Sequence, residues 1–234
     1  MSALTPAHRL YEGDAGRHYH EGKRALDAGA LEWVVRARAQ LFAGHIRPEH
    51  AVLEYGVGAG WNLLGLQCRR RVGIDVQCFL APGWESRGIE FFPTKASLPG
   101  DSYDVILCHH ALEHVESPAA TLTELLRLAK PGGRLLLAVP YESERRYRRH
   151  DPNEPNHHLY SWNVQSLGNL VTLCGWTLES VGLRRYGYDR FAANVACRKR
   201  LGETGFRALR QLLQLMKPCR EIALVARRAA QGGA

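Results

Sequence analysis

The chain has 234 residues, of which 45% are hydrophobic, so it is long enough to bury a full core in one large α/β domain. No apolar stretch approaches the roughly 20 residues that a membrane span needs, and the N-terminus lacks the apolar core of a signal peptide. We therefore expect a soluble, cytoplasmic protein. The six cysteines are scattered singly without a Cys-x-x-Cys pair, which argues against a disulfide scaffold and against a zinc knuckle.

The net charge of +8 has two interpretations. A basic excess favours an anionic partner, such as a nucleic acid, a sugar nucleotide, a phospholipid head group or an acidic polysaccharide. An arginine-rich proteome produces basic enzymes without any such partner, and the arginines here are only partly clustered.

The N-terminal segment divides into two parts. Residues 1–20 are polar and rich in His, Tyr and Gly, which predicts an irregular lead-in. From about Glu21 to Gly44 the apolar residues recur at helical spacing, which predicts an amphipathic helix before the first strand.

Residues 52–60, Val-Leu-Glu-Tyr-Gly-Val-Gly-Ala-Gly, are an apolar run followed by three alternate glycines. This pattern predicts a buried strand, a tight turn and the start of a helix at Trp61. Glycines let the backbone approach a ligand closely, and the first amides of a helix are free to donate hydrogen bonds. The dinucleotide fingerprint requires glycine at the position of Trp61. The acidic Glu54 also suits a positively charged ligand better than a pyrophosphate.

This stretch resembles motif I of the class I S-adenosylmethionine (SAM)-dependent methyltransferases, which has the form acid-x-Gly-x-Gly-x-Gly. The resemblance implies that Glu54 faces the amino or sulfonium end of SAM. Three glycines would lie beside the methionine part of SAM: Gly56, Gly58 and Gly60. It further implies that residues 1–48 form a helical cap over the cofactor, and a disordered or merely packed tail is the alternative. Three side chains of this segment are candidates for closing over SAM: Tyr11, His18 and Tyr19.

Residues 71–76 predict a second short strand that ends in an acid, Asp75. In a parallel doubly wound sheet the loops at the carboxyl ends of the strands form the ligand crevice, so we expect Asp75 beside the glycine turn. A carboxylate there can accept hydrogen bonds from both ribose hydroxyls. Because NAD-binding domains also place an acid here, Asp75 indicates an adenosine ribose without choosing the cofactor.

Residues 88–92 predict the third strand, which leads into the Leu98-Pro99 pair. In sequences that resemble this one, an Asp a few residues before the Leu-Pro pair often receives the adenine amino group. Thr94 stands at that place here, so Thr94 or backbone groups around Ala96 would serve instead, with Leu98 beside them.

The stretch from 104 to 140 carries the strongest evidence for the fold and for the family resemblance. It predicts a fourth strand, a helix capped by Ser117 with Pro118 at its first position, and a fifth strand over 134–140. The Asp-Val pair, Leu-Glu-His-Val and Ala-Lys-Pro-Gly-Gly-Arg-Leu closely resemble the broad SAM-methyltransferase family that includes the ubiquinone-biosynthesis and many sugar methyltransferases. The likeness covers roughly residues 50–180 and implies SAM as the cofactor.

Two histidines end the fourth strand. By the resemblance, His109 lies near the cofactor, while His110 is a candidate to face the substrate. An imidazole with a pKa of about 6.5 can take a proton from an attacking hydroxyl near neutral pH. Glu113 and His114 follow at the expected start of the next helix, where they are expected to pack or cap.

The stretch from 141 to 162 predicts a long irregular loop at the edge of the sheet where substrate-binding insertions belong. Its arginines can hold a phosphate or carboxylate, and a plain solvated loop is the alternative. The candidate substrate-binding residues are Tyr141, Arg145, Arg146 and Arg148. By resemblance to the stretch that leads into the next helix in many such enzymes, His157 and His158 are further candidate bases.

The remaining elements complete the predicted fold. We expect a helix capped by Ser161 and ended by Gly175, a strand over 176–183, a helix over 206–216 and a last strand over 221–226. The fold implied is a Rossmann-like doubly wound α/β sheet of seven strands, mostly parallel with an antiparallel last strand and helices on both faces. We expect one domain over 1–234, with the SAM-binding half at 49–140 and the substrate loop and C-terminal half at 141–234.

The leading hypothesis is a small-molecule O-methyltransferase that acts on a saccharide, a cell-envelope precursor or a natural-product precursor, without a metal. The base would be His110, His157 or His158, and the arginine-rich loop would bind an anionic part of the acceptor. SAM already carries an activated methyl group, so the protein has to align the acceptor and remove its proton.

Three alternatives differ in class. The first is an RNA ribose 2′-O-methyltransferase, because the small-RNA enzymes hold a divalent metal with a Glu-x-x-Glu-His cluster at this helix start plus a later histidine. The matching positions here are His110, Glu113, His114 and His158. The second is a SAM-binding regulator without turnover. The third is a NAD-dependent oxidoreductase, which Trp61 disfavours.

Overall fold

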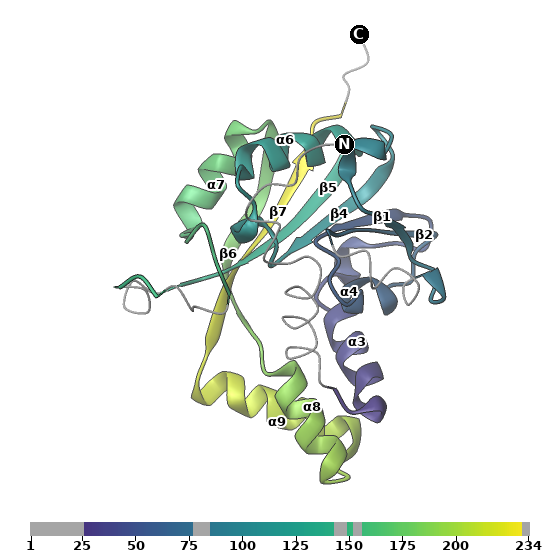
Figure 1. The fold of residues 1–234 in the computed structure, drawn as a ribbon, viewed down its shortest axis with the longest axis vertical. Coiled ribbons are helices and arrows are strands. Elements are labelled where there is room, and N and C mark those ends of the chain that lie inside the picture. Colours follow the sequence, from purple (N-terminus) through teal and green to yellow (C-terminus); the bar gives the residue numbers. More distant parts are fainter. Residues whose placement is uncertain (1–25, 77–84, 143–148, 152–155, 231–234) are drawn as a thin grey trace. The chain divides into compact units, whose positions relative to one another are not determined.

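The computed structural model describes residues 26–76, 85–142, 149–151 and 156–230. Its strands lie in one seven-stranded sheet with the order β3-β2-β1-β4-β5-β7-β6 (Figure 1). The strands are β1 (Ala51–Tyr55), β2 (Arg70–Ile74), β3 (Glu90–Phe92), β4 (Tyr103–His109), β5 (Ala129–Pro140), β6 (Trp176–Tyr186) and β7 (Cys219–Arg228). The pairs β1–β2, β2–β3 and β4–β5 are parallel, whereas β7 runs antiparallel to β5. The predicted α/β fold with an antiparallel last strand is confirmed.

The first of two compact units lies within residues 1–97 and 185–219. It holds β1 to β3, the short 3-10 helices η1 (Ala28–Ala30), η2 (Ala43–His45) and η4 (Lys95–Ser97), and the helices α3 (Leu31–Ala39), α4 (Trp61–Leu64), α8 (Asp189–Arg198) and α9 (Gly202–Met216). The helices α3, α8 and α9 share a core of mostly small side chains, which lets their backbones approach closely. Its buried members are Ala30, Val34, Ala37, Ala192, Ala193, Ala196 and Phe206.

One prediction for this unit needs correction, and one of its helices was not predicted. The N-terminal helix was expected from about Glu21, but within the described residues α3 begins at Leu31 after the separate turn η1. The helix α8 was not predicted, because its buried face consists of alanines between charged residues and gives a weak apolar period. Its Asp189 forms ion pairs with Arg38 of α3 and Arg210 of α9, which explains why an arginine occupies the apolar side of α3.

The second unit lies within residues 98–184 and 220–234 and holds β4, β5 and most of β6 and β7. Its helices are η5 (Leu112–His114), α6 (Pro118–Leu128) and α7 (Val164–Leu173). The predicted start of α6 is confirmed, since the Ala120 N–H donates to the Ser117 hydroxyl and Pro118 occupies the first helical position. The fifth strand is longer than predicted and begins at Ala129.

The prediction that Ser161 caps α7 is wrong. The cap is Asn163, whose side chain accepts the Ser166 N–H at 2.8 Å, and Ser166 reaches back to the Asn163 N–H at 3.3 Å. This reciprocal arrangement satisfies two backbone donors at once, so it is favoured over a single serine cap. Gly175 follows the helix with a φ of 91°, as the predicted end requires.

None of the helices within the described ranges is long and apolar enough to cross a membrane. The expected single domain over 1–234 stays a prediction, because the described residues divide into two compact units.

Candidate active site

The first unit carries the glycine turn that follows β1. Gly56, Gly58 and Gly60 all have positive φ angles, of 73°, 51° and 73°, a conformation that glycine adopts without strain. The Gly58 N–H donates to Oδ2 of Asp75 at 2.7 Å. The predicted adjacency of Asp75 and the glycine turn is therefore present, and the role of Asp75 in binding ribose stays a prediction.

Glu54 at the end of β1 is a buried carboxylate with one satisfied oxygen. Asn62 of α4 donates its amide to Oε1 at 2.5 Å, whereas Oε2 has no hydrogen-bond partner within the described residues. Burial raises the pKa of Glu54 to about 8, although the Asn62 hydrogen bond and the charge of Arg38 oppose the shift. A cationic group placed against Glu54 would satisfy the second oxygen and ionise the carboxyl.

The segment expected to contact adenine contains the short helix η4. The Ala96 N–H donates to Oγ1 of Thr94 at 3.3 Å, so Thr94 caps this turn, which leaves adenine binding at Thr94 and Ala96 a prediction. Leu98 is buried, and its carbonyl accepts a hydrogen bond from Arg127 at 3.2 Å.

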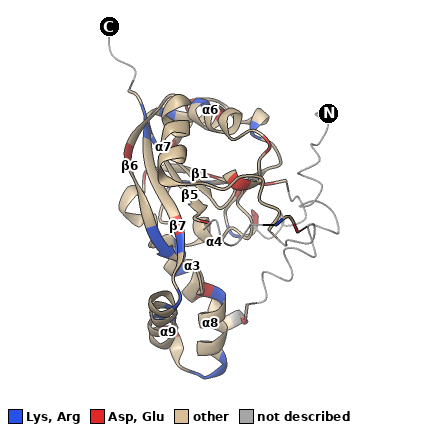
Figure 2. Cartoon of the chain, turned by 90° about the vertical axis from the view of Figure 1, so that its left-hand side faces the viewer, with Lys and Arg blue, Asp and Glu red and all other residues tan. Residues whose placement is uncertain are grey.

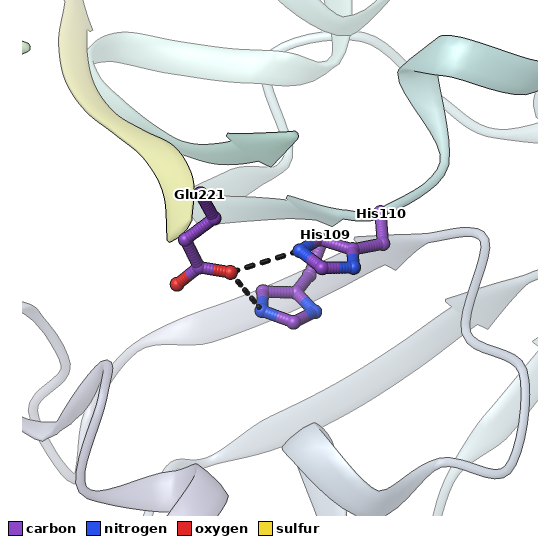
Figure 3. A group of neighbouring side chains, drawn as sticks. All are labelled: His109, His110 and Glu221. Atoms are coloured by element: carbon purple, nitrogen blue, oxygen red, sulfur yellow. Dashed lines mark hydrogen bonds and ion pairs between the residues drawn. The ribbon is translucent and has the colours of Figure 1, made fainter. Parts of the chain in front are cut away.

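In the second unit, His109 and His110 at the end of β4 meet Glu221 of β7 (Figure 3). Nε2 of His110 lies 2.8 Å from Oε2 of Glu221, and Nε2 of His109 lies 3.5 Å from the same oxygen. The two rings stack with centroids 4.4 Å apart. Arg184 of β6 donates to the other carboxylate oxygen at 2.7 Å. Three cationic or proton-bearing side chains therefore surround one carboxylate, which we call the Glu221 cluster.

The Glu221 cluster fixes the proton on one ring nitrogen of His110. Burial by itself raises the pKa of Glu221, but the two facing imidazoles outweigh it and hold this pKa well below its usual range. An ionised carboxylate only accepts hydrogen bonds, so Nε2 of His110 carries a proton that it donates to Glu221. His110 also has a φ of 54°, a left-handed conformation that is strained for a residue with a side chain.

A second polar cluster surrounds η5 and consists of Glu113, His114, His158 and Glu142, which we call the Glu113 cluster. Glu113 is buried, and Nε2 of His114 lies 3.8 Å from its Oε1. Nδ1 of His158 lies 2.6 Å from Oε1 of Glu142. Glu113 and His114, which were expected at the start of the next helix, lie in the separate 3-10 helix η5, and α6 begins at Pro118.

The candidate substrate residues are only partly described. Tyr141 is 38% exposed, and its N–H donates to the carbonyl of Arg220. His157 has a φ of 49°. Arg145, Arg146 and Arg148 lie outside the described residues, as do Tyr11, His18 and Tyr19. Their proposed roles stay predictions.

Sequence reasoning missed the residues that orient the histidines. Glu221 is 111 positions away from His110 in the chain, and Glu142 was part of an irregular stretch. The available signal was an acid within an otherwise apolar strand, since Glu221 directly precedes Ile-Ala-Leu-Val-Ala. A buried acid in a strand requires partners, and an antiparallel strand begins at the edge where its parallel neighbour ends, as the pairing of Glu221 with Pro140 shows.

Comparison with known proteins agrees with this architecture. Residues 24–181 match the family model described as "Methyltransferase domain". A demethylmenaquinone methyltransferase from Beutenbergia cavernae is 32% identical over 135 residues, which cover 53% of this chain and 54% of that protein. A ubiquinone biosynthesis O-methyltransferase from Aeromonas salmonicida is 38% identical over 52 residues, which cover 22% of each chain. The chain thus spans about half or less of the length of these curated relatives.

Solved structures agree on the fold. A SAM-dependent methyltransferase from Thermotoga maritima superposes with a TM-score of 0.63 at 16% identity, covering 94% of this chain and 99% of that one.

Because the family model matches well over half of the sequence, the chain belongs to the methyltransferase-domain family, whose class is that of the SAM-dependent methyltransferases of class I. The cofactor of this class is SAM, and the residues present fit it. The left-handed glycines let a ligand approach the backbone, and the unpartnered oxygen of Glu54 suits a positively charged group.

Proposed function

We propose that the protein transfers the methyl group of SAM to a hydroxyl group of a small molecule, such as a saccharide, a cell-envelope precursor or a natural-product precursor. The observation that carries the proposal is His110, whose ring is held by the buried carboxylate of Glu221 in the tautomer that a general base requires. The relative from Aeromonas salmonicida is named an O-methyltransferase, which agrees with a hydroxyl acceptor.

The first unit supplies most of the groups proposed to hold SAM, whereas the candidates Leu98 and His109 belong to the second unit. Asp75 would accept the ribose hydroxyls, the glycine turn would lie along the methionine part, and Glu54 would pair with its positively charged end. Bound SAM supplies a methyl group on a sulfonium sulfur, which needs no further activation.

His110 provides the proton acceptor in this proposal. The acceptor oxygen forms its bond to the methyl carbon as the carbon–sulfur bond breaks, and the hydroxyl proton passes to Nδ1 of His110. The imidazolium so formed keeps its Nε2 proton directed at Glu221, whose negative charge stabilises it. His157 and His158 remain the other candidate bases.

An anionic acceptor is consistent with the distribution of charge. Basic residues lie along β6 and β7 (Figure 2), and Arg184 of β6 already forms an ion pair with Glu221. Arg145, Arg146 and Arg148 would add guanidinium groups that bind a phosphate or carboxylate in a bidentate manner.

The acceptor class is tested by methyl transfer from isotopically labelled SAM into a host extract. The extract is separated afterwards into small-molecule, polysaccharide and lipid, RNA, and protein fractions. We expect label in the small-molecule or envelope fraction with the wild type, and its loss with His110→Ala. Label confined to RNA or protein would contradict the proposed acceptor.

The cofactor site is tested separately by calorimetry. Asp75→Ala should weaken SAM binding by about 100-fold, because two charge-assisted hydrogen bonds worth about 1.5 kcal/mol each are lost. Asp75→Asn is the conservative control and should lose less. An unchanged SAM affinity in Asp75→Ala would contradict the role of Asp75.

A further inference from the structure

The basic charge of the chain is concentrated in one segment of the first unit. Residues 185–219 hold eight lysines and arginines but only two acids, so they carry a net charge of +6, out of +8 for the whole chain. Both acids, Asp189 and Glu203, already form ion pairs with arginines of α3 and α9. A basic excess gathered in one place favours an anionic partner there, whereas a uniformly basic surface does not.

The helix α9 is apolar on the face that packs against the protein. Phe206 is fully buried in the core that α9 shares with α3 and α8, and Leu209 and Leu213 pack against the same core. The ring of Phe206 stacks on the ring of Trp33 of α3, with the centroids 6.3 Å apart. These contacts attach α9 to the first unit.

The opposite face of α9 is also apolar, but it lies in solvent. Leu212, Leu215 and Met216 are 52%, 54% and 75% exposed. Leu201, which directly precedes the helix, is 53% exposed, and Ala208 is exposed as well. Positions 201, 208, 212 and 215 recur at helical spacing and therefore share one face, with Met216 beside them. We call these five residues the outer face of α9. Exposed apolar side chains that gather on one face indicate a contact surface, whereas single ones do not.

Exposed cations flank the outer face at both ends. Lys199 and Arg200 lie in the turn between α8 and α9, which is basic in Figure 2, and Lys217 follows the end of α9. Beside the outer face, the charge of Arg207 is neutralised by Glu203 at 2.8 Å. An apolar strip between cationic ends fits a partner with an apolar interior and an anionic surface, which is the arrangement of an anionic lipid bilayer.

Two other occupants fit this surface less well. In a twofold contact between two copies of the chain, the same patch meets itself, so two segments that each carry +6 would repel each other. A nucleic acid would use the cations but not the leucines and the methionine, because unpaired bases stack on aromatic side chains. The combination of exposed cations and exposed leucines therefore favours a lipid surface.

We infer that the outer face of α9, together with its basic ends, docks on the surface of an anionic lipid bilayer. With 15 residues α9 is about 22 Å long, so it lies along the bilayer and does not cross it. The leucines and Met216 enter the boundary between the head groups and the acyl chains. Lys199, Arg200 and Lys217 contact the lipid phosphates. The inner face of α9 keeps its contacts with α3 and α8, so docking requires no unfolding of the first unit.

A membrane contact narrows the choice among acceptors. If the proposed function is correct, a protein held at a bilayer meets acceptors that are carried on lipids, which favours a cell-envelope precursor. This role rests on the proposed function, whereas the membrane contact rests on α9 and its basic ends alone.

The contact is tested by co-sedimentation of the full chain with lipid vesicles. One set contains phosphatidylcholine with roughly one-third phosphatidylglycerol, and the other contains phosphatidylcholine alone. We expect saturable binding to the anionic vesicles that is at least about tenfold weaker on the neutral vesicles and at high salt. The double variant Leu212→Ser/Leu215→Ser should weaken binding by about 100-fold, because two leucines no longer leave water. Lys199→Ala/Arg200→Ala should weaken it by about 20-fold, roughly fivefold for each cation.

Leu173→Ser is the matched control, because Leu173 is an exposed leucine of α7 in the other unit. It should leave vesicle binding unchanged. Circular dichroism and SAM affinity confirm that each variant is folded, as expected for side chains that lie outside the core around Phe206. Equal vesicle affinity in the wild type and Leu212→Ser/Leu215→Ser would overturn the inference. Equal weakening by Leu173→Ser and by Leu212→Ser/Leu215→Ser would overturn it as well, as would a failure of the wild type to bind anionic vesicles.

The other occupants give different results. A dimer in sedimentation velocity that Leu212→Ser/Leu215→Ser dissociates would assign the outer face to a second copy and overturn the lipid contact. Binding of an RNA oligonucleotide that is lost in Lys199→Ala/Arg200→Ala, without vesicle binding, would assign the basic ends to nucleic acid and overturn it too. Vesicle binding without any methyl transfer would keep the membrane contact and contradict the proposed function. Methyl transfer by a protein that does not bind vesicles would keep the function and overturn the contact.

Discussion

Glu221 and Glu113 lie in the same unit, both are almost fully buried, and their pKa values move in opposite directions. Glu221 is surrounded by two imidazoles and a guanidinium, so its carboxylate is ionised. Glu113 has imidazoles nearby, but within the described residues neither of its oxygens has a hydrogen-bond partner. The comparison shows that burial alone does not set the state of a carboxyl group, because the partners on its oxygens decide it.

The difference in partners gives the two carboxyl groups different roles. Glu221 orients neighbouring side chains, whereas Glu113 does not. Glu221 is complete within the protein, so its effect is to hold His110 and His109 in place. Glu113 has no hydrogen-bond partner within the described residues, so burial raises its pKa and favours the protonated carboxyl. Each of the following predictions probes one side of this difference.

The largest effect is expected on stability when Glu221 is removed. Glu221→Ala leaves Arg184 and two imidazoles without their shared anion, and breaking a buried charged pair costs about 3–5 kcal/mol. This corresponds to roughly a thousandfold change in the unfolding equilibrium, which urea denaturation measures at pH 7. Since the pKa of Glu221 is lowered by folding, its contribution is present above the ordinary glutamate pKa and disappears as the pH falls below it.

Glu113→Gln is the matched substitution for that experiment. It removes a charge from an equally buried site without leaving a paired cation behind, so the protein should lose little stability at pH 7. Equal destabilisation by Glu221→Ala and Glu113→Gln would contradict the distinction between the two carboxylates.

The next largest effect is expected on turnover. His110→Ala removes the proposed base and should lower kcat by about 100-fold, the lower end of what general-base catalysis contributes, while the Kd for SAM stays the same. Glu221→Gln should shift the pH profile of kcat, because a neutral amide replaces the anion that holds the Nε2 proton of His110 and stabilises its imidazolium form. A larger loss of kcat in His157→Ala than in His110→Ala would transfer the role of base to His157.

A third prediction concerns Glu54, which has one partnered and one unpartnered oxygen and so stands between the two cases. Burial raises its pKa to about 8. SAM carries positive charge and pairs with the ionised form, so SAM affinity should rise as the pH increases towards about 8 and then level off. We expect roughly a tenfold change in SAM affinity per pH unit at most, measured by calorimetry between pH 6 and 9. Glu54→Gln should flatten the dependence.

The smallest effect is the pH dependence of stability at Glu113. Folding raises its pKa, so the folded protein retains a proton that the unfolded chain releases above the ordinary glutamate pKa. The stability contributed by this group is therefore present at low pH and decreases as the pH rises towards the folded value. Glu113→Gln should lack this decrease, which appears as a difference of a few degrees in midpoint at pH 8.

Much of the fold could be predicted, because its signals are local. The apolar run before the glycine turn, the Ser117-Pro118 helix start and the antiparallel last strand all depend on neighbouring residues, and each is present. The adjacency of Asp75 and Gly58 follows from the rule that parallel strands deliver their ends to one edge. The cap of α7 was misplaced because Ser161 and Asn163 are both good caps, and only the reciprocal bond to Ser166 distinguishes them.

The two clusters could be predicted only in part. The histidines were identified from their position at strand and loop ends, but the partners that define their chemistry come from distant segments. Glu221 reaches His110 across 111 positions, and Glu142 reaches His158 across 16 positions that include residues outside the described ranges. A single sequence holds no signal for such pairs, because tertiary packing chooses them.

The most direct test is the tautomeric state of the histidines, read from long-range ¹⁵N–¹H spectra of ¹⁵N-histidine-labelled protein. His110 should carry its proton on Nε2, which faces Glu221, and His158 should carry it on Nδ1, which faces Glu142. The signals of His110 should change in Glu221→Gln, and those of His158 should not. The same tautomer in His110 and His158 would contradict the assignment of Glu221 to orienting His110.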